Sequence, residues 1–304
     1  MNVGKVSCGF LKNRLNIKLN EPQNIIFCGF GYLALSCIKV LKENNYNIKA
    51  ILTHESTDKD SVKAYAIEHN ITYYVDDLKK AQNIHDKILE LASLNKISYL
   101  ISINYRYIIP TSFFSHFSVA LNLHGSLLPR FRGRTPHVWA IINGQKESGV
   151  TCHKIAKIVD SGDIIEQVKV AIDDNDTGYS LLKKLEAHYP IVLLKALDKI
   201  KNGFKGYMQN EDEATYFGVR TPIMGYISFN NDFNTINNFV RAQAYPYPGS
   251  YYYLGDGRKI IINKIQKYKA NIQKKPIGQI FISDDKYLVF CKDSLIVIEN
   301  YTIE

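Results

Sequence analysis

Cysteine is scarce in this chain and follows no pattern typical of a disulfide framework or a zinc site. The 304 residues contain five cysteines, an odd number, and no two of them form a C-x-x-C pair. Disulfide-stabilised domains and zinc ribbons need cysteines paired at short, regular spacing. We therefore expect neither class, and we expect a cytoplasmic protein kept in a reducing compartment.

Long apolar runs are also missing. No run approaches the ~20 residues that a helix needs to cross a bilayer. Residues 1–23 contain four basic residues and no sustained apolar stretch, so we do not expect a signal peptide there. We expect no membrane partner, and residues 1–23 form an N-terminal extension of unknown use.

Histidines do not cluster with other metal ligands. No His, Cys or Asp cluster shows the spacing of metal ligands, and His137 and His153 look isolated. We expect no metal.

The remaining composition is that of an ordinary folded protein. Hydrophobic residues make up 46% and charged residues 22%, enough to bury one large core or two smaller ones. The formal net charge of +9 suits an anionic partner such as a nucleotide, a phosphate or RNA, but a solvated basic surface gives the same charge. Charge alone leaves these alternatives open.

Strand and helix patterns alternate through the first two thirds of the chain. Such alternation is typical of right-handed βαβ units, so we predict an α/β domain with a Rossmann-like, doubly wound, mostly parallel sheet over residues 1–207. Short β-like runs separated by turns then predict a smaller β domain over residues 208–304, of Greek-key barrel type. The expected strands of the first domain include 24–30, 48–54, 71–75, 99–105 and 118–124.

A glycine-rich turn follows the first predicted strand. Residues 29–34 match G-x-G-x-x-A, and Glu55 lies near the end of the second strand. This arrangement occurs in nicotinamide-binding folds, but it also occurs as a plain tight turn between strand and helix. The motif is short, and the plain turn is the favoured interpretation.

A polar pair ends the fifth strand. Asn122 and His124 are two residues apart, so they point to the same face near the carboxyl end, where open α/β sheets bind ligands. An amide can stabilise an oxyanion, and an imidazole can accept a proton from an attacking amine. A carboxylate that orients the imidazole would come from Asp160 or Asp163. Taken singly, each residue also suits a structural role, and spacing does not decide.

Ser126 follows this pair but is not a candidate nucleophile. No nucleophile elbow surrounds Ser126, and no cysteine stands beside His124. Direct transfer to an amine therefore fits better than a covalent intermediate.

Residues 122–165 contain four motifs in a fixed order: Asn-x-His, S-L-L-P-x-x-R-G, G-V-T and D-x-G-D. Together they resemble the signature region of the 10-formyltetrahydrofolate-dependent formyltransferases, and the resemblance extends over residues 24–304. It implies that Asn122, His124 and Asp160 are catalytic and that 10-formyltetrahydrofolate is the co-substrate. It also implies an OB-like C-terminal domain and a glycine turn that binds no dinucleotide.

The resemblance also implies a folate pocket. Residues 102–110 are similar to the family segment that lines it, and we expect the turn before Asp160 to contribute as well. We expect the pterin to be held there, largely by backbone hydrogen bonds. The residues expected at this pocket are Asn104, Tyr105, Arg106, Ile158 and Asp163.

Two family branches differ in the amine that they formylate. The net charge and the basic stretch 257–276 favour methionyl-tRNA as acceptor. Segment 53–66 argues against it, because this segment is short and carries three acids, which repel phosphates, where tRNA enzymes have a basic insertion. Several segments are similar to the domain that formylates UDP-4-amino-4-deoxy-L-arabinose. We therefore expect a nucleotide-linked amino sugar, with methionyl-tRNA as the alternative.

The expected acceptor is a UDP- or dTDP-linked 4-amino-4,6-dideoxy sugar used in surface glycan or O-antigen biosynthesis. Its diphosphate needs a few cations, and bidentate arginines suit it. We expect Arg132, Arg134 and Arg220 in this role. No nucleic acid partner is expected, and the sequence leaves a monomer and a homodimer both open.

Overall fold

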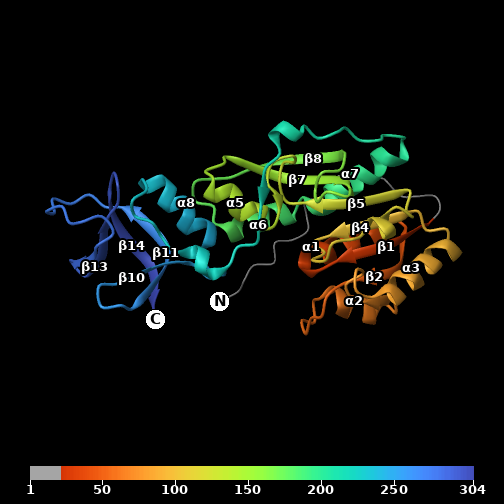
Figure 1. The fold of residues 1–304 in the computed structure, drawn as a ribbon, viewed down its shortest axis with the longest axis horizontal. Coiled ribbons are helices and arrows are strands. Elements are labelled where there is room, and N and C mark those ends of the chain that lie inside the picture. Colours follow the sequence, from red (N-terminus) through yellow and green to blue (C-terminus); the bar gives the residue numbers. More distant parts are fainter. Residues whose placement is uncertain (1–21) are drawn as a thin grey trace.

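The computed structural model describes residues 22–304, which contain two large β-sheets, each with its own helices (Figure 1). The N-terminal extension expected at residues 1–23 thus lies almost entirely outside the described residues. No helix of the described part combines the length and the apolar character needed to cross a bilayer.

The first sheet has seven strands in the order β3-β2-β1-β4-β5-β7-β8. Neighbours from β3 to β5 pair in parallel, whereas β5 with β7 and β7 with β8 pair antiparallel. The predicted Rossmann-like, mostly parallel sheet is confirmed. Its strands are β1 (Gln23–Gly29), β2 (Tyr46–Leu52), β3 (Thr72–Tyr74), β4 (Tyr99–Ile103), β5 (Val119–His124), β7 (Glu147–Lys154) and β8 (Ile164–Ala171).

Alternate residues of the central strands enter two apolar cores, one on each face of the sheet. In β1, Ile25 and Phe27 pack with α1 and α7, whereas Ile26 and Cys28 pack with α3. Burial on both faces requires a continuous apolar run, which is what identified this strand in the sequence. The helices are α1 (Gly31–Glu43), α2 (Val62–Glu68), α3 (Gln82–Leu94), α4 (Thr111–Phe114), α5 (Pro136–Ile142), α6 (Gly178–Glu186) and α7 (Tyr189–Lys201).

The strand order reverses at β1, because β2 lies on one side of it and β4 on the other. The helices α1 and α3 contribute to cores on opposite faces. At such a switch point the loops beyond the strand ends diverge and leave a crevice that is suited to a ligand. The strands β1, β4 and β5 end there at Gly29, Ile103 and His124.

The C-terminal domain is an antiparallel sheet in the order β10-β11-β14-β13-β12. Ile236 and Val240 of α8 (Phe233–Gln243) pack on this sheet, against Ile260 and Ile262 among others. A smaller β domain is thus confirmed, although its strand pairs form an open sheet with β10 and β12 at its edges. The strands are β10 (Ser250–Tyr253), β11 (Lys259–Lys267), β12 (Ile280–Ser283), β13 (Lys286–Phe290) and β14 (Leu295–Ile303).

The chain between the two domains returns across the loops of the first sheet. Tyr207 forms an isolated bridge with Ile164, and β9 (Tyr216–Phe217) pairs in parallel with β6 (Arg132–Gly133). The Trp139 indole then donates to the Gly218 carbonyl at 3.0 Å. Residues 216–218, which lie beyond the expected boundary at 207/208, thus contact residues of the first domain.

Candidate active site

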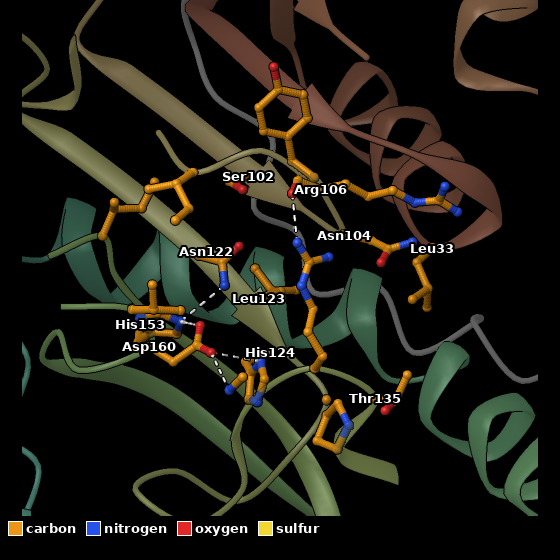
Figure 2. A pocket seen from close by; sticks show the side chains of 18 of the residues that line it. Leu33, Ser102, Asn104, Arg106, Asn122, Leu123, His124, Thr135, His153 and Asp160 are labelled. Carbon is orange, nitrogen blue, oxygen red and sulfur yellow. Dashed lines mark hydrogen bonds and ion pairs between the residues drawn. The ribbon is translucent and has the colours of Figure 1, made fainter. Parts of the chain in front are cut away.

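A cavity of about 420 Å³ opens at the carboxyl ends of the central strands (Figure 2). One wall is polar and comes from the ends of β4 and β5 and from the turn around Asp160. Apolar side chains, which include Leu33, Leu182 and Leu185, also line the cavity. The cavity thus combines polar groups for chemistry with apolar surface for binding, as ligand sites usually do.

Asn122 and His124 both line this cavity, as their spacing on one strand predicts. The next strand in the sheet, β7, runs antiparallel to β5 and places His153 directly opposite Asn122. The Asn122 amide nitrogen lies 3.1 Å from His153 Nε2. Strand pairing therefore adds a second histidine to the predicted polar pair.

Asp160 approaches the same point from the turn between β7 and β8. Its Oδ2 lies 3.5 Å from His124 Nδ1, and its Oδ1 lies 3.5 Å from His153 Nε2. The Gly133 backbone N–H donates to Oδ2 at 2.9 Å. Asp160 has a φ of 57°, in the left-handed region that non-glycine residues rarely adopt, and this backbone conformation is part of the turn that carries its carboxylate.

Asp160 is ionised at neutral pH. Burial by itself raises the pKa of a carboxyl, but the positive charge that His124 and His153 carry when protonated, together with the Gly133 N–H, favours the charged form and holds the pKa of Asp160 well below its usual range. The side chain is only 8% exposed. A buried carboxylate therefore lies beside two imidazoles.

The Phe131 carbonyl fixes the tautomer of His124. It lies 2.7 Å from His124 Nε2, and a carbonyl can only accept, so Nε2 carries the hydrogen. The neutral ring then has its lone pair on Nδ1, the nitrogen that faces Asp160. A proton taken up at Nδ1 would produce an imidazolium with a partner for each N–H, which is the arrangement that a general base needs.

The tautomer of His153 is fixed in the same way. Its Nδ1 lies 2.8 Å from the Lys154 carbonyl and must donate, so in the neutral ring Nε2 accepts from the Asn122 amide. The NH₂ group of Asn122 is thereby turned toward His153 and keeps a second hydrogen for another acceptor. Sequence reasoning treated His153 as isolated and missed it, because only the register of β7 on β5 brings it to the site.

The expected folate residues divide into two groups. Asn104, Tyr105 and Arg106 line the cavity. Ile158 and Asp163 do not: Ile158 is 60% exposed on the turn, and Asp163 pairs with Lys154 at 2.9 Å. Ile158 and Asp163 therefore lie outside the cavity, whereas their neighbours Lys157 and Val159 line it.

The end of β4 is held against the glycine turn after β1. The Asn104 amide donates to the Phe30 carbonyl at 3.0 Å, and the Arg106 guanidinium lies 4.1 Å from the Phe30 ring centroid. The Arg106 backbone N–H donates to His54 Nε2 at 3.0 Å. Residues of the G-x-G-x-x-A motif thus support this wall of the cavity.

The three arginines expected at the substrate differ sharply in position. Arg134 is exposed, lines the cavity and donates to the Arg106 carbonyl at 2.7 Å. Arg132 is 0% exposed, and its guanidinium is bonded to Gln209, Glu211 and Tyr216. With every donor directed at protein groups, Arg132 has none left for a phosphate, and its predicted role is corrected.

Arg220 is also outside the cavity. Its guanidinium lies 4.7 Å from the Trp139 ring centroid and donates to Gln243 and to the Met224 carbonyl. These contacts join the domains, so its predicted substrate contact is corrected as well. Within residues 22–304, no group of three or more His, Cys, Asp or Glu side chains has an arrangement that could hold a metal ion.

Comparison with known proteins gives the same family for both domains. Residues 23–197 match the family described as formyl transferase, and residues 220–304 match the formyl transferase C-terminal domain. The bifunctional polymyxin resistance protein ArnA of Wigglesworthia glossinidia brevipalpis is 33% identical over 270 residues, covering 86% of this chain and 40% of that protein. The chain thus spans well under half of that relative.

Two solved structures have the same fold. The N-formyltransferase of Helicobacter canadensis, crystallised with folinic acid and dTDP-3-aminofucose, gives a TM-score of 0.70 at 20% identity over 91% of this chain and 99% of that one. A 4-N formyltransferase of Francisella tularensis gives 0.65 at 22% identity over 79% of this chain and 96% of that one. With both domain matches and the relative's identity, this chain belongs to the formyl transferase family.

Proposed function

We propose that this chain transfers the formyl group of 10-formyltetrahydrofolate to the primary amine of a nucleotide-linked amino deoxysugar. The observation that carries the proposal is the convergence of Asn122, His124 and Asp160 in the cavity at the sheet's switch point. Two proteins of similar fold support both substrates: one is named a sugar N-formyltransferase, and the other is an N-formyltransferase crystallised with folinic acid and dTDP-3-aminofucose.

In the proposed reaction the folate supplies the formyl carbon, and residues of this chain move the charge and the proton. As the amine attacks, the second hydrogen of the Asn122 amide binds the formyl oxygen, where negative charge develops. His124 Nδ1 accepts a proton from the amine, and Asp160 stabilises the resulting imidazolium. The new carbon–nitrogen bond forms, the bond to the donor nitrogen breaks, and His124 returns the proton to that nitrogen.

The residues around the cavity fit both substrates. Ile109, Ile155 and Val159 supply apolar surface beside backbone groups of the Asp160 turn, which suits a flat pterin ring. Arg106 and Arg134 are exposed at the same cavity and supply two cations for a diphosphate. We propose these two arginines in place of Arg132 and Arg220.

Charge pairing favours the sugar over methionyl-tRNA. In and beside the basic stretch 257–276, Arg258 pairs with Asp256, Lys259 with Glu304 and Lys264 with Glu299. Cations that already have acidic partners release few counterions when a nucleic acid binds. We therefore propose a cytoplasmic enzyme with a UDP- or dTDP-linked 4-amino-4,6-dideoxy sugar as acceptor, in surface glycan biosynthesis and without a nucleic acid partner. A homodimer stays an untested expectation.

We further propose that the catalytic domain extends to about residue 218 rather than 207. The supporting contacts are the pairing of Tyr216–Phe217 with Arg132–Gly133 and the hydrogen bond from Trp139 to Gly218. The matched family regions leave residues 198–219 between them, so they do not fix this boundary.

The function is tested by incubating the protein and 10-formyltetrahydrofolate with a panel of nucleotide-linked amino sugars and with initiator methionyl-tRNA. Mass spectrometry should detect the gain of one formyl group on a sugar nucleotide. Formylation of the tRNA with every sugar unchanged would contradict the proposal and support the alternative. An Asp160→Asn variant is the control for background transfer.

A further inference from the structure

Gln209 lies in the segment between the domains, yet its side chain reaches the turn that carries Asp160. Its amide nitrogen donates to the Asp160 carbonyl at 2.8 Å and to the Gly162 carbonyl at 2.7 Å. Its amide oxygen accepts from Arg132 Nη2 at 2.8 Å and from Nε at 3.2 Å. Both hydrogens and both lone pairs of this 9% exposed amide are therefore used.

The two hydrogen bonds from Gln209 to the Asp160 and Gly162 carbonyls, called the clamp below, restrain a turn whose backbone needs support. Asp160 has a φ of 57°, which a non-glycine residue keeps only when its surroundings impose it. The turn is also packed closely, because a Cβ on Gly162 would lie 2.0 Å from the Lys154 carbonyl oxygen. Gln209 bonds the carbonyls on both sides of Ser161 and so restrains the backbone that aims the Asp160 carboxylate.

Arg132 determines which way the Gln209 amide faces. A guanidinium only donates, so the Gln209 oxygen must face Arg132 and the NH₂ group must face the turn. Glu211 holds the guanidinium through two bonds of 2.6 and 2.8 Å, and Tyr216 adds a third partner. Arg132 is thus oriented by the segment between the domains, and Gln209 is oriented by Arg132.

We propose that Gln209 is a positioning residue for Asp160, oriented by Arg132. The proposal rests on the proposed function only in so far as Asp160 is catalytic. Gln209 touches no reacting atom. It acts by keeping the carboxylate within reach of His124, and a misplacement on the order of 1 Å at a catalytic group can cost on the order of 10²-fold in rate.

The same segment also supports the loop that orients His124. Thr215 Oγ1 accepts from the Phe131 N–H at 2.8 Å, and the Thr215 carbonyl accepts from the Arg132 N–H at 2.8 Å. The Phe131 carbonyl accepts a hydrogen bond from His124 Nε2, and the Gly133 N–H donates to Asp160 Oδ2. Residues 209–217 therefore hold both partners of the proposed proton-transfer pair.

The test uses the full chain with Gln209→Met, which keeps the side-chain length and removes every hydrogen bond. Turnover should fall on the order of 10²-fold while the KM for the sugar nucleotide stays unchanged.

Gln243→Met is the matched control. Gln243 is likewise buried, accepts from Arg220 at 2.7 Å and donates to the Phe239 carbonyl at 3.0 Å, but lies far from Asp160 in sequence and does not line the cavity. Its substitution should lower thermal stability and leave turnover unchanged.

A double-mutant cycle separates positioning from a general loss of structure. If Gln209 acts through Asp160, adding Gln209→Met to Asp160→Asn should reduce turnover little further. If the double variant instead lost turnover by the product of the two single losses, the proposal would be overturned. Wild-type turnover in Gln209→Met would overturn it as well. Gln209→Asn keeps the amide but is one methylene shorter, so it should be intermediate and gives a second variant if the methionine variant does not fold.

Hydrogen–deuterium exchange tests the clamp without any substrate. Amides of residues 158–163 should exchange faster in Gln209→Met than in the wild type or in Gln243→Met, with β7 and β8 unchanged. Unchanged exchange in this turn would overturn the clamp even if every sugar is formylated. Conversely, faster exchange together with a wild type that formylates no sugar would support the clamp and count against the proposed function.

Discussion

The carboxylate of Asp160 lies 3.5 Å from Nδ1 of His124, the ring nitrogen that the Phe131 carbonyl leaves free to accept a proton. This relationship assigns different tasks to the two residues. His124 can take up and return a proton, whereas Asp160, already ionised, stabilises the charge that His124 acquires. Activity should therefore depend on both residues and on the groups that hold them.

Loss of any member of the proposed trio should lower turnover strongly. Asn122→Ala, His124→Ala and Asp160→Asn should each reduce kcat by about 10²–10⁴-fold, the usual range for a positioned acid–base group or oxyanion donor. Circular dichroism should show that the fold is retained. Near-normal turnover in two of the three variants would contradict the assignment.

His153 should matter through Asn122 rather than by itself. His153→Leu removes the acceptor that turns the Asn122 amide, so kcat should fall by about tenfold, a loss expected from one misdirected hydrogen bond. His153→Gln can return an acceptor oxygen near the same place and should recover part of the rate. Equal turnover in the two variants would argue against this role.

Asp160 should also contribute to stability in a pH-dependent way. Because the pKa of Asp160 is lower in the folded protein than in the unfolded chain, its carboxylate stabilises the fold above the ordinary aspartate pKa of about 4, and this contribution is lost as the pH falls below that value. The difference in unfolding free energy between wild type and Asp160→Asn should therefore be largest near pH 7 and shrink below about pH 4. Urea unfolding at several pH values measures it, and a difference that grows toward acid pH would refute this electrostatic cause.

The two exposed arginines should control use of the sugar nucleotide. Arg106→Ala and Arg134→Ala should each raise its KM by about tenfold, because each removes a charge-assisted contact to the diphosphate. Steady-state kinetics measures both effects. The control is a variant with Lys264, Lys267 and Lys269 all changed to alanine, whose KM for the sugar nucleotide should barely change. Arg132→Ala should instead lower kcat and stability, since its guanidinium is buried.

The segment between the domains should be needed for a complete folate site. A fragment of residues 1–219 should bind folinic acid, whereas residues 1–207 should bind it more weakly, because the shorter fragment lacks Gln209, Thr215 and Phe217. Calorimetry measures both affinities, with circular dichroism to show that both fragments are folded. Equal affinity of the two fragments for folinic acid would instead support a domain boundary at 207/208.

Much of the architecture was predictable because local patterns report it directly. Buried parallel strands need continuous apolar runs, so β1, β2 and β4 were identified in the sequence close to their observed positions. The two-residue period of a strand placed Asn122 and His124 on one face. The ordered motifs of residues 122–165 then gave the family, which both domain matches confirm.

What the sequence could not decide depends on contacts between distant segments. Asp160 and Asp163 have the same chemistry in one turn, so residue type and spacing leave both open and only the resemblance favours Asp160. In the structure Asp160 lies beside His124, whereas Asp163 pairs with Lys154. His153 joins the site through the register between β7 and β5. Arg132 and Arg134 are two residues apart, yet Arg132 is buried against the chain at 209–216, whereas Arg134 is exposed at the cavity. The sequence by itself determined the strands, the family and the kind of groups present, whereas the tertiary structure decided their roles, because burial and hydrogen-bond partners come from residues remote along the chain.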